Sequence, residues 1–261
     1  MTIEFFSFWH VFWVMFNVIA TVVLYKTFKN RSRRAQHWLV YGLILLNLIF
    51  HFTLPIFTQE SPERFIRAIS WSNICAGIVL MSPFVYWQRD HFLKPGWLYV
   101  SIIAGLAVLV NPTDALGRSP FELDVFRFFV QHWLILVVPV LLISFNHETL
   151  RWKDLWTTPV LMTFMVAMVI ANAAILQVLG VVSDMRGTNA AFQWRPADLE
   201  GALGWLVPST FTRIPFGPNA GEFTHWPLIY KLPAYFILGP LFTALINGVN
   251  LAFRRVGKKL S

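Results

Sequence analysis

The sequence predicts an all-α fold class, a polytopic membrane helix bundle of about seven spans, on three observations. Hydrophobic residues make up 56% of the 261 residues and charged residues only 13%, whereas soluble domains carry about 25% charged residues. The apolar residues form blocks of roughly 18 or more nearly uncharged residues, which is typical of spanning helices. Basic residues flank these blocks, so the net charge of +8 fits membrane topology better than nucleic-acid binding. We expect a single transmembrane domain over residues 1–261.

Four spans are expected in the first half of the chain, at residues 5–25, 38–57, 65–87 and 97–110. The first follows an N-terminus without a basic region, which favours a retained span over a cleaved signal peptide. The fourth is short, because its 14 residues reach about 21 Å and a hydrocarbon core is about 30 Å thick. It is therefore either a span in a locally thinned bilayer or a re-entrant segment.

Three further spans are expected at residues 124–145, 157–182 and 228–253. The long connection between the last two, residues 183–227, is rich in Trp, Pro and Gly and is expected to lie outside, where it could serve as a lid. Within it, residues 198–206 resemble a short interfacial helix that begins at a capping aspartate.

The distribution of basic residues predicts the orientation. Most of the 21 Lys and Arg residues lie at the ends that share a side with the basic loop at residues 26–34. Since such loops stay in the cytoplasm, we expect the N-terminus outside and the C-terminus in the cytoplasm.

Four polar side chains are expected at similar depths on four different spans. Cys75 and His132 each lie about eight residues, or about 12 Å, below the outer end of a span, and His51 and Asn172 lie about six and about ten residues deep. Isolated polar groups in hydrocarbon are costly, so these four should face the bundle interior and interact with one another.

Each of these residues also has a structural interpretation. Cys75 can be a small apolar filler, and His132 can bond a neighbouring carbonyl group. Asn172 can join two helices through a hydrogen bond, and Arg127 can extend to the outer interface. Cys75 and His132 together form a known nucleophile arrangement, in which imidazole takes the thiol proton and the thiolate attacks an ester.

The helical position of its neighbours suggests which residue assists Cys75. In an unbroken third span, Ser72 shares the face of Cys75, whereas Asn73 is rotated away by about 200°. Ser72 is therefore the better candidate partner for Cys75.

Several short motifs carry a resemblance over about residues 35–196. They are residues 72–75, 104–106, 111–112, 119–121 and 126–132, and residues 187–189 followed by Phe192. The chain resembles the YwaF-like family of bacterial integral membrane proteins, which is related to eukaryotic transmembrane-protein acyltransferases that make ether phospholipids. In that family a cysteine in a long span is followed by a short span and by a histidine early in the next helix, as Cys75 and His132 are here. The chain departs from the family at Asn73, where histidine is usual, and at Ala190, where an aromatic residue is common.

The resemblance implies transfer of a fatty acyl group between phospholipid and lysophospholipid. Cys75 would carry the acyl group as a thioester, and His132 would act as base and then as acid. It implies no cofactor, no metal and no nucleic acid, and a location in the bacterial cytoplasmic (inner) membrane. The candidate substrate-binding residues are Arg127, Ser72, His51, Asn172 and Asn189.

Three other functions stay open at this point. A non-catalytic membrane subunit, scaffold or assembly factor with protein partners in a larger complex would agree with Asn73 and with the long connection. A transporter would need more intramembrane charges than the chain has. A metal site made by His51, Cys75 and His132 would draw its ligands from three helices without local ligand spacing.

Overall fold

The structure is a computed structural model that describes residues 2–59, 61–88, 92–182 and 232–259. The described residues form α-helices and short 3₁₀ turns without a strand, so the predicted all-α class is confirmed. The chain divides into two compact units. The first comprises Met1–Phe65 and Ile78–Leu150, and the second Ile66–Gly77 and Arg151–Ser261. The predicted outer connection, its interfacial helix at residues 198–206 and Asn189 lie outside the described residues.

The protein is an integral membrane protein with several apolar helices. Among the described residues, five helices are long and apolar enough to cross a membrane, and a bent pair brings the number to six. The predicted seventh span falls on α8 (Leu232–Lys259), whose described apolar part is the shorter segment Tyr235–Leu251. The five are α1 (Phe8–Phe28), α2 (Arg33–Thr58), α5 (Leu93–Val110), α6 (Leu123–Ser144) and α7 (Thr157–Val178), the last preceded by the 3₁₀ turn Trp152–Asp154.

The fourth predicted segment is longer than its sequence suggested. α5 begins at Leu93 rather than at residue 97, and its 18 residues reach about 27 Å. The sequence Lys94-Pro95-Gly96 resembles a loop, but proline is tolerated in the first helical turn because its missing N–H has no helical acceptor there. By length, α5 is a candidate span and needs no re-entrant geometry.

The irregular segment is instead the third one. The prediction of one continuous helix over residues 65–87 was wrong. Two helices, α3 (Pro62–Ile69) and α4 (Ile74–Trp87), meet at an angle of 55°. α3 begins earlier than expected because the Ser61 hydroxyl accepts the N–H of Arg64 at 3.3 Å and proline suits the first helical position. Counting residues along one straight helix therefore does not give the depth of Cys75.

α6 is the central helix of the first unit and packs against α1, α2 and α5. Its inward residues, such as Phe129 and Leu134, are fully buried, and the ring of Trp13 on α1 stacks on Phe129 at 5.3 Å. α1 is the least buried of the spans, and Val18, for example, is 51% exposed. Exposed apolar side chains on spanning helices face lipid, so α1 lies at the margin of this unit.

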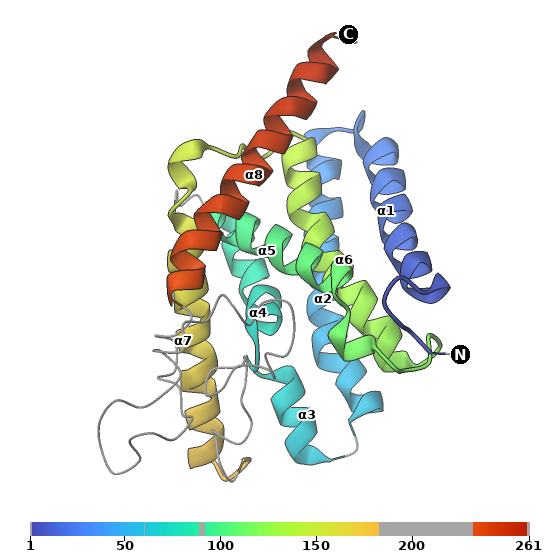
Figure 1. Cartoon of the computed structure of the whole chain (residues 1–261), viewed down its shortest axis with the longest axis vertical. Helices are drawn as coiled ribbons and strands as arrows, with labels where there is room; N and C mark the ends of the chain where they lie inside the picture. Colours follow the sequence, from blue (N-terminus) through green and yellow to red (C-terminus); the bar gives the residue numbers. More distant parts are fainter. Residues whose placement is uncertain (1, 60, 89–91, 183–231, 260–261) are drawn as a thin grey trace. The chain divides into compact units, whose positions relative to one another are not determined.

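One end of the first unit is closed by the N-terminal segment, which Figure 1 shows beside the start of α6. The N–H of Ile3 donates to the carbonyl of Arg118, and the carbonyl of Ile3 accepts the N–H of Gly117. Gly117 has a positive φ of 75°. His10 Nδ1 accepts the N–H of Phe6 at 3.1 Å, and its Nε2 therefore carries the hydrogen that it donates to the carbonyl of Leu109 at 2.9 Å. Both nitrogens of this buried histidine are thus satisfied.

The opposite end of the first unit holds a polar cluster beside the predicted cytoplasmic loops. His37 Nδ1 lies 2.6 Å from the Tyr86 hydroxyl, and the rings of His37 and His147 are 4.1 Å apart. Lys94 pairs with Glu148 at 2.6 Å. These bonds join the start of α2, the end of α4, the start of α5 and the loop after α6.

Protonation of His147 should weaken this end of the unit. Burial lowers the pKa of His147, and His37, Arg33 and Lys94 lower it further against the opposing effect of Glu148. A histidine with a lowered pKa in the folded state contributes full stability above its unfolded value of about 6.5 and loses it as the pH falls through that value. We expect the melting temperature of His147→Gln to fall less between pH 7.5 and 5.5 than that of the wild type, as measured by thermal unfolding in detergent. Equal falls in both proteins would contradict this assignment.

The second unit contains the close pair α7 and α8, which lie side by side in Figure 1. The Thr158 and Thr243 hydroxyls are 2.8 Å apart, and Thr243 also bonds the carbonyl of Gly239. A Cβ at Gly239 would lie 3.3 Å from the Pro159 ring. Small residues at the contact therefore let these two helices approach closely, as is common between membrane helices.

Candidate functional site

Cys75 lies in the first turn of α4, immediately after the bend. Asn73 directly precedes this helix, and its Oδ1 accepts the N–H of Ala76 at 2.8 Å, which is the geometry of a helix N-cap. The preference for Ser72 over Asn73 as a partner of Cys75 assumed an unbroken helix, and the helix is interrupted between α3 and α4. Their positions on one helical face therefore no longer distinguish the two residues. The N-terminal end of a helix dipole favours negative charge, and Cys75 lies at that end of α4.

Asn172 reaches the bend from α7 within the second unit. Its Nδ2 donates to the Ser70 hydroxyl at 3.1 Å, and that hydroxyl donates to the carbonyl of Arg67 at 3.0 Å. Ser72 adds a backbone bond, from its N–H to the carbonyl of Ser70 at 2.8 Å. The helix-joining role open to Asn172 is therefore observed, and it fixes the chain just before the segment that leads to Cys75.

Trp71 and Gly77 form a contact that sequence reasoning missed. The indole of Trp71 covers Gly77 so closely that a Cβ there would overlap Nε1 and lie 2.8 Å from Cζ2. The indole N–H is buried without a hydrogen-bond partner among the described residues. The only sequence signal is a glycine two residues after Cys75 in an apolar run, and it does not name its tryptophan partner.

His132 belongs to α6 in the first unit, and its ring is oriented by its own helix. Nδ1 lies 2.7 Å from the carbonyl of Phe128, which can only accept, so Nδ1 carries the hydrogen. Nε2 then holds the lone pair that a general base needs. The Phe128 ring lies 4.7 Å from the imidazole. His132 thus makes the bond to a neighbouring carbonyl that a purely structural histidine would make. The same bond selects the tautomer that can act as a base at Nε2.

The loop before α6 is held by charged groups that set where this helix begins. Arg118 contacts Glu122 at 2.7 Å and Asp124 at 3.2 Å. Burial lowers the pKa of Arg118, but the hydrogen bonds to these two carboxylates outweigh burial and raise it. The N–H of Ser119 and the Arg118 guanidinium hold the pKa of the Glu122 carboxyl below its usual range. Both groups therefore stay charged at neutral pH.

Arg127 lies one turn into α6 and about one turn before His132. Its guanidinium is 3.9 Å from the Asp124 carboxylate and 3.4 Å from the Thr58 hydroxyl at the end of α2. The side chain is 24% exposed, so it can still meet a charged group outside the protein. His51 is buried on α2, a helix that packs against α6.

Cys75 belongs to the second unit and His132 to the first. The surroundings of each residue are therefore given within its own unit. The structure brings Asn172 to Ser70 beside the bend, and it brings Arg127 to the end of α2. In the parts of the chain that the structure describes, no three His, Cys, Asp or Glu side chains gather as metal ligands would.

Comparison with known proteins identifies the family. The model of the TMEM164 family matches residues 5–211, most of the chain, including both Cys75 and His132. The comparisons with curated proteins and with solved structures each find no match. With a family model that covers the helices from α1 to α7, the chain belongs to the TMEM164 family of membrane proteins.

Proposed function

We propose that this protein is a membrane-embedded acyltransferase that moves a fatty acyl group between phospholipid and lysophospholipid through a thioester on Cys75. The observation that carries the proposal is the position of Cys75 in the first turn of α4, after the Asn73 cap. A thiol at a helix N-terminus forms a thiolate more readily than one in the middle of a span. His132, with its hydrogen on Nδ1, supplies the base at Nε2.

The reaction proceeds in two halves that balance in atoms and protons. His132 Nε2 takes the thiol proton, Cys75 Sγ attacks the ester carbonyl carbon, and the carbon–oxygen bond to glycerol breaks. The proton passes from Nε2 to the glycerol oxygen, which leaves as the hydroxyl of a lysophospholipid. A second lysophospholipid hydroxyl then gives its proton to Nε2 and attacks the thioester, and Sγ leaves and takes the proton back. The mechanism requires Sγ and Nε2 to come within about 3–4 Å of each other.

Substrate binding draws on the polar groups around these two residues. Arg127 is suited to a lipid phosphate because guanidinium groups bind phosphate oxygens in pairs. Asn172 holds the bend through Ser70 and so positions Cys75. His51, Ser72 and Asn189 remain candidate contacts.

A lipid exchange assay tests this function. Purified protein in phospholipid vesicles should transfer acyl chains to a labelled lysophospholipid, and Cys75→Ala and His132→Ala should both fall to the background rate, because neither keeps a nucleophile–base pair. Normal turnover in both variants would refute the proposal. Stoichiometric partner chains that co-purify with a silent Cys75→Ala variant would indicate a scaffold or assembly subunit instead.

A further inference from the structure

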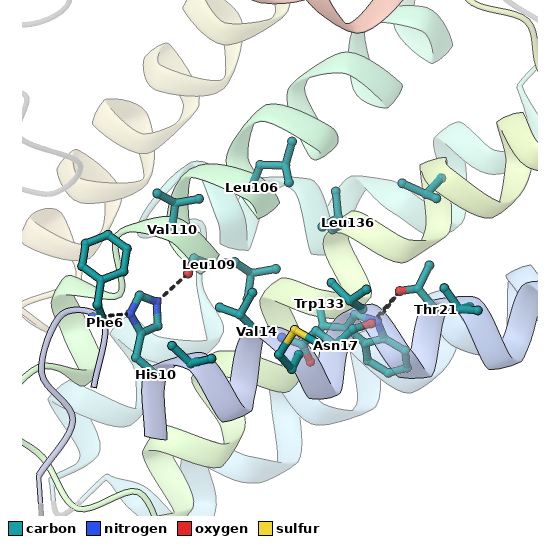
Figure 2. Close-up of a pocket in the computed structure, with 15 residues that line it drawn as sticks. Phe6, His10, Val14, Asn17, Thr21, Leu106, Leu109, Val110, Trp133 and Leu136 are labelled. Carbon is teal, nitrogen blue, oxygen red and sulfur yellow. Dashed lines mark hydrogen bonds between the residues drawn. The ribbon is translucent and has the colours of Figure 1, made fainter. Parts of the chain in front are cut away.

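A cavity of about 380 Å³ lies in the first unit between α1, α5 and α6. Figure 2 shows Val14 and Asn17 of α1 facing Leu109 of α5 and Leu136 of α6 across it. Its walls are mostly apolar, with aliphatic side chains in the majority. The volume falls within the range of about 300–1,000 Å³ that is usual for small-molecule sites.

The cavity opens toward the lipid side of the unit. Among its lining residues, Val18 on α1 is 51% exposed and Val110 at the end of α5 is 65% exposed. Both lie on candidate spanning helices, so whatever enters through this opening comes from the hydrocarbon of the bilayer. The occupant is therefore expected to be a molecule that dissolves in the bilayer.

Asn17 is the polar lining residue whose side chain stays unsatisfied within the described part of the chain. The side chain is 2% exposed, and neither Nδ2 nor Oδ1 has a hydrogen-bond partner among the described residues. The other polar lining residues are satisfied: His10 through both ring nitrogens, and Trp133 through a 2.9 Å bond from Nε1 to the Thr21 hydroxyl. Thr21 in turn donates to the backbone carbonyl of Asn17. An unpaired amide in hydrocarbon is costly, and a ligand that pairs both of its atoms would recover that cost.

We propose that this cavity binds a protonated long-chain fatty acid, with its carboxyl group on the Asn17 amide. A neutral carboxylic acid matches a carboxamide on both sides, because its C=O accepts from Nδ2 and its O–H donates to Oδ1. An ester can only accept and would leave Oδ1 unpaired. Among the described lining residues there is no Lys or Arg, and hydrocarbon disfavours the charged form of an acid, so the neutral form is bound. Both amide atoms are closed off from water, so binding includes a rotation of the Asn17 side chain toward the acid.

Photocrosslinking tests this site. A long-chain fatty acid with a diazirine and an alkyne is added to the purified full-length protein in nanodiscs, and labelled peptides are identified by mass spectrometry. Label should fall on α1 and on the facing parts of α5 and α6. The free acid should compete about tenfold better than its methyl ester, the expected loss for one buried hydrogen bond. Equal competition by acid and ester would overturn the proposal.

Three variants make the test specific. Asn17→Leu should lower labelling about 5- to 10-fold, whereas Asn47→Leu, at another buried asparagine on α2, should label like the wild type. Leu106→Trp, which fills the cavity from its 46% exposed wall, should abolish labelling without a change in the core. Unchanged labelling in Asn17→Leu and Leu106→Trp would overturn the site. A change of oligomeric mass in Asn17→Leu, without competition by fatty acid, would show a second chain in the cavity and would also overturn it.

The site uses neither Cys75 nor His132, so it does not rest on the proposed acyl transfer. Cys75→Ala should bind the probe as the wild type does. Binding without acyl transfer, or transfer without binding, would therefore separate the two proposals.

Discussion

Replacement of His132 by glutamine is expected to lower acyl transfer by about 10²–10⁴-fold, the usual contribution of a positioned general base. Glutamine keeps an N–H that can donate to the carbonyl of Phe128, so the orienting bond has a substitute. It has no nitrogen that can take the thiol proton from Cys75. The measurement is the initial rate of acyl exchange in vesicles at equal protein content.

The matched control for this variant is His147→Gln. His147 lies in the loop after α6, where it contacts Gln36 and His37 and has no part in the proposed reaction. The rate of acyl exchange by His147→Gln should stay within a few-fold of the wild-type rate at neutral pH. A wild-type rate for His132→Gln would show that His132 is not the base.

Gly105→Ala is expected to destabilise the first unit by about 1–3 kcal/mol, the usual cost of overpacking. A Cβ at Gly105 would lie 2.8 Å from the Cβ of Leu136 and 3.2 Å from the carbonyl oxygen of His132. Both atoms are fixed by the α6 backbone, so α5 and α6 must separate to admit the methyl group. The separation would also displace His132 and should reduce acyl transfer.

Gly42→Ala is the control for Gly105→Ala. A Cβ at Gly42, in the middle of α2, would meet nothing within 4 Å. Alanine there should be neutral or should stabilise the helix by about 0.5–1 kcal/mol, because glycine is the poorer helix former. Thermal unfolding of both variants in one detergent gives the comparison. A Gly105→Ala protein that melts at or above the temperature of Gly42→Ala would contradict the close packing of α5 on α6.

The spans could be predicted because hydrocarbon solvent imposes long apolar helices with satisfied backbones. The two errors lie where short polar signals compete with that pattern. Proline in the first turn of α5 was interpreted as a loop. The sequence from Ser70 to Asn73 carries the capping residues typical of a helix start, but the apolar residues on both sides suggested one continuous span.

The candidate site was predictable only in part. The helix-joining bond of Asn172 and the carbonyl bond of His132 follow from the chemistry of each residue in a membrane, and the sequence alone indicates both as structural alternatives. The contact of Trp71 with Gly77 and the unpaired amide of Asn17 were not predictable. Both depend on which residues the fold brings together, and the spacing of residues along the chain does not indicate this. The pairing of Cys75 with His132 stays a prediction.

Whether Cys75 carries an acyl group is measured by the intact mass of the purified protein after incubation with phospholipid vesicles. We expect a mass increase of one acyl chain that maps to the peptide of Cys75, is removed by neutral hydroxylamine, and is absent from Cys75→Ala. An unchanged mass in the wild type, or an acyl group that persists in Cys75→Ala, would contradict it.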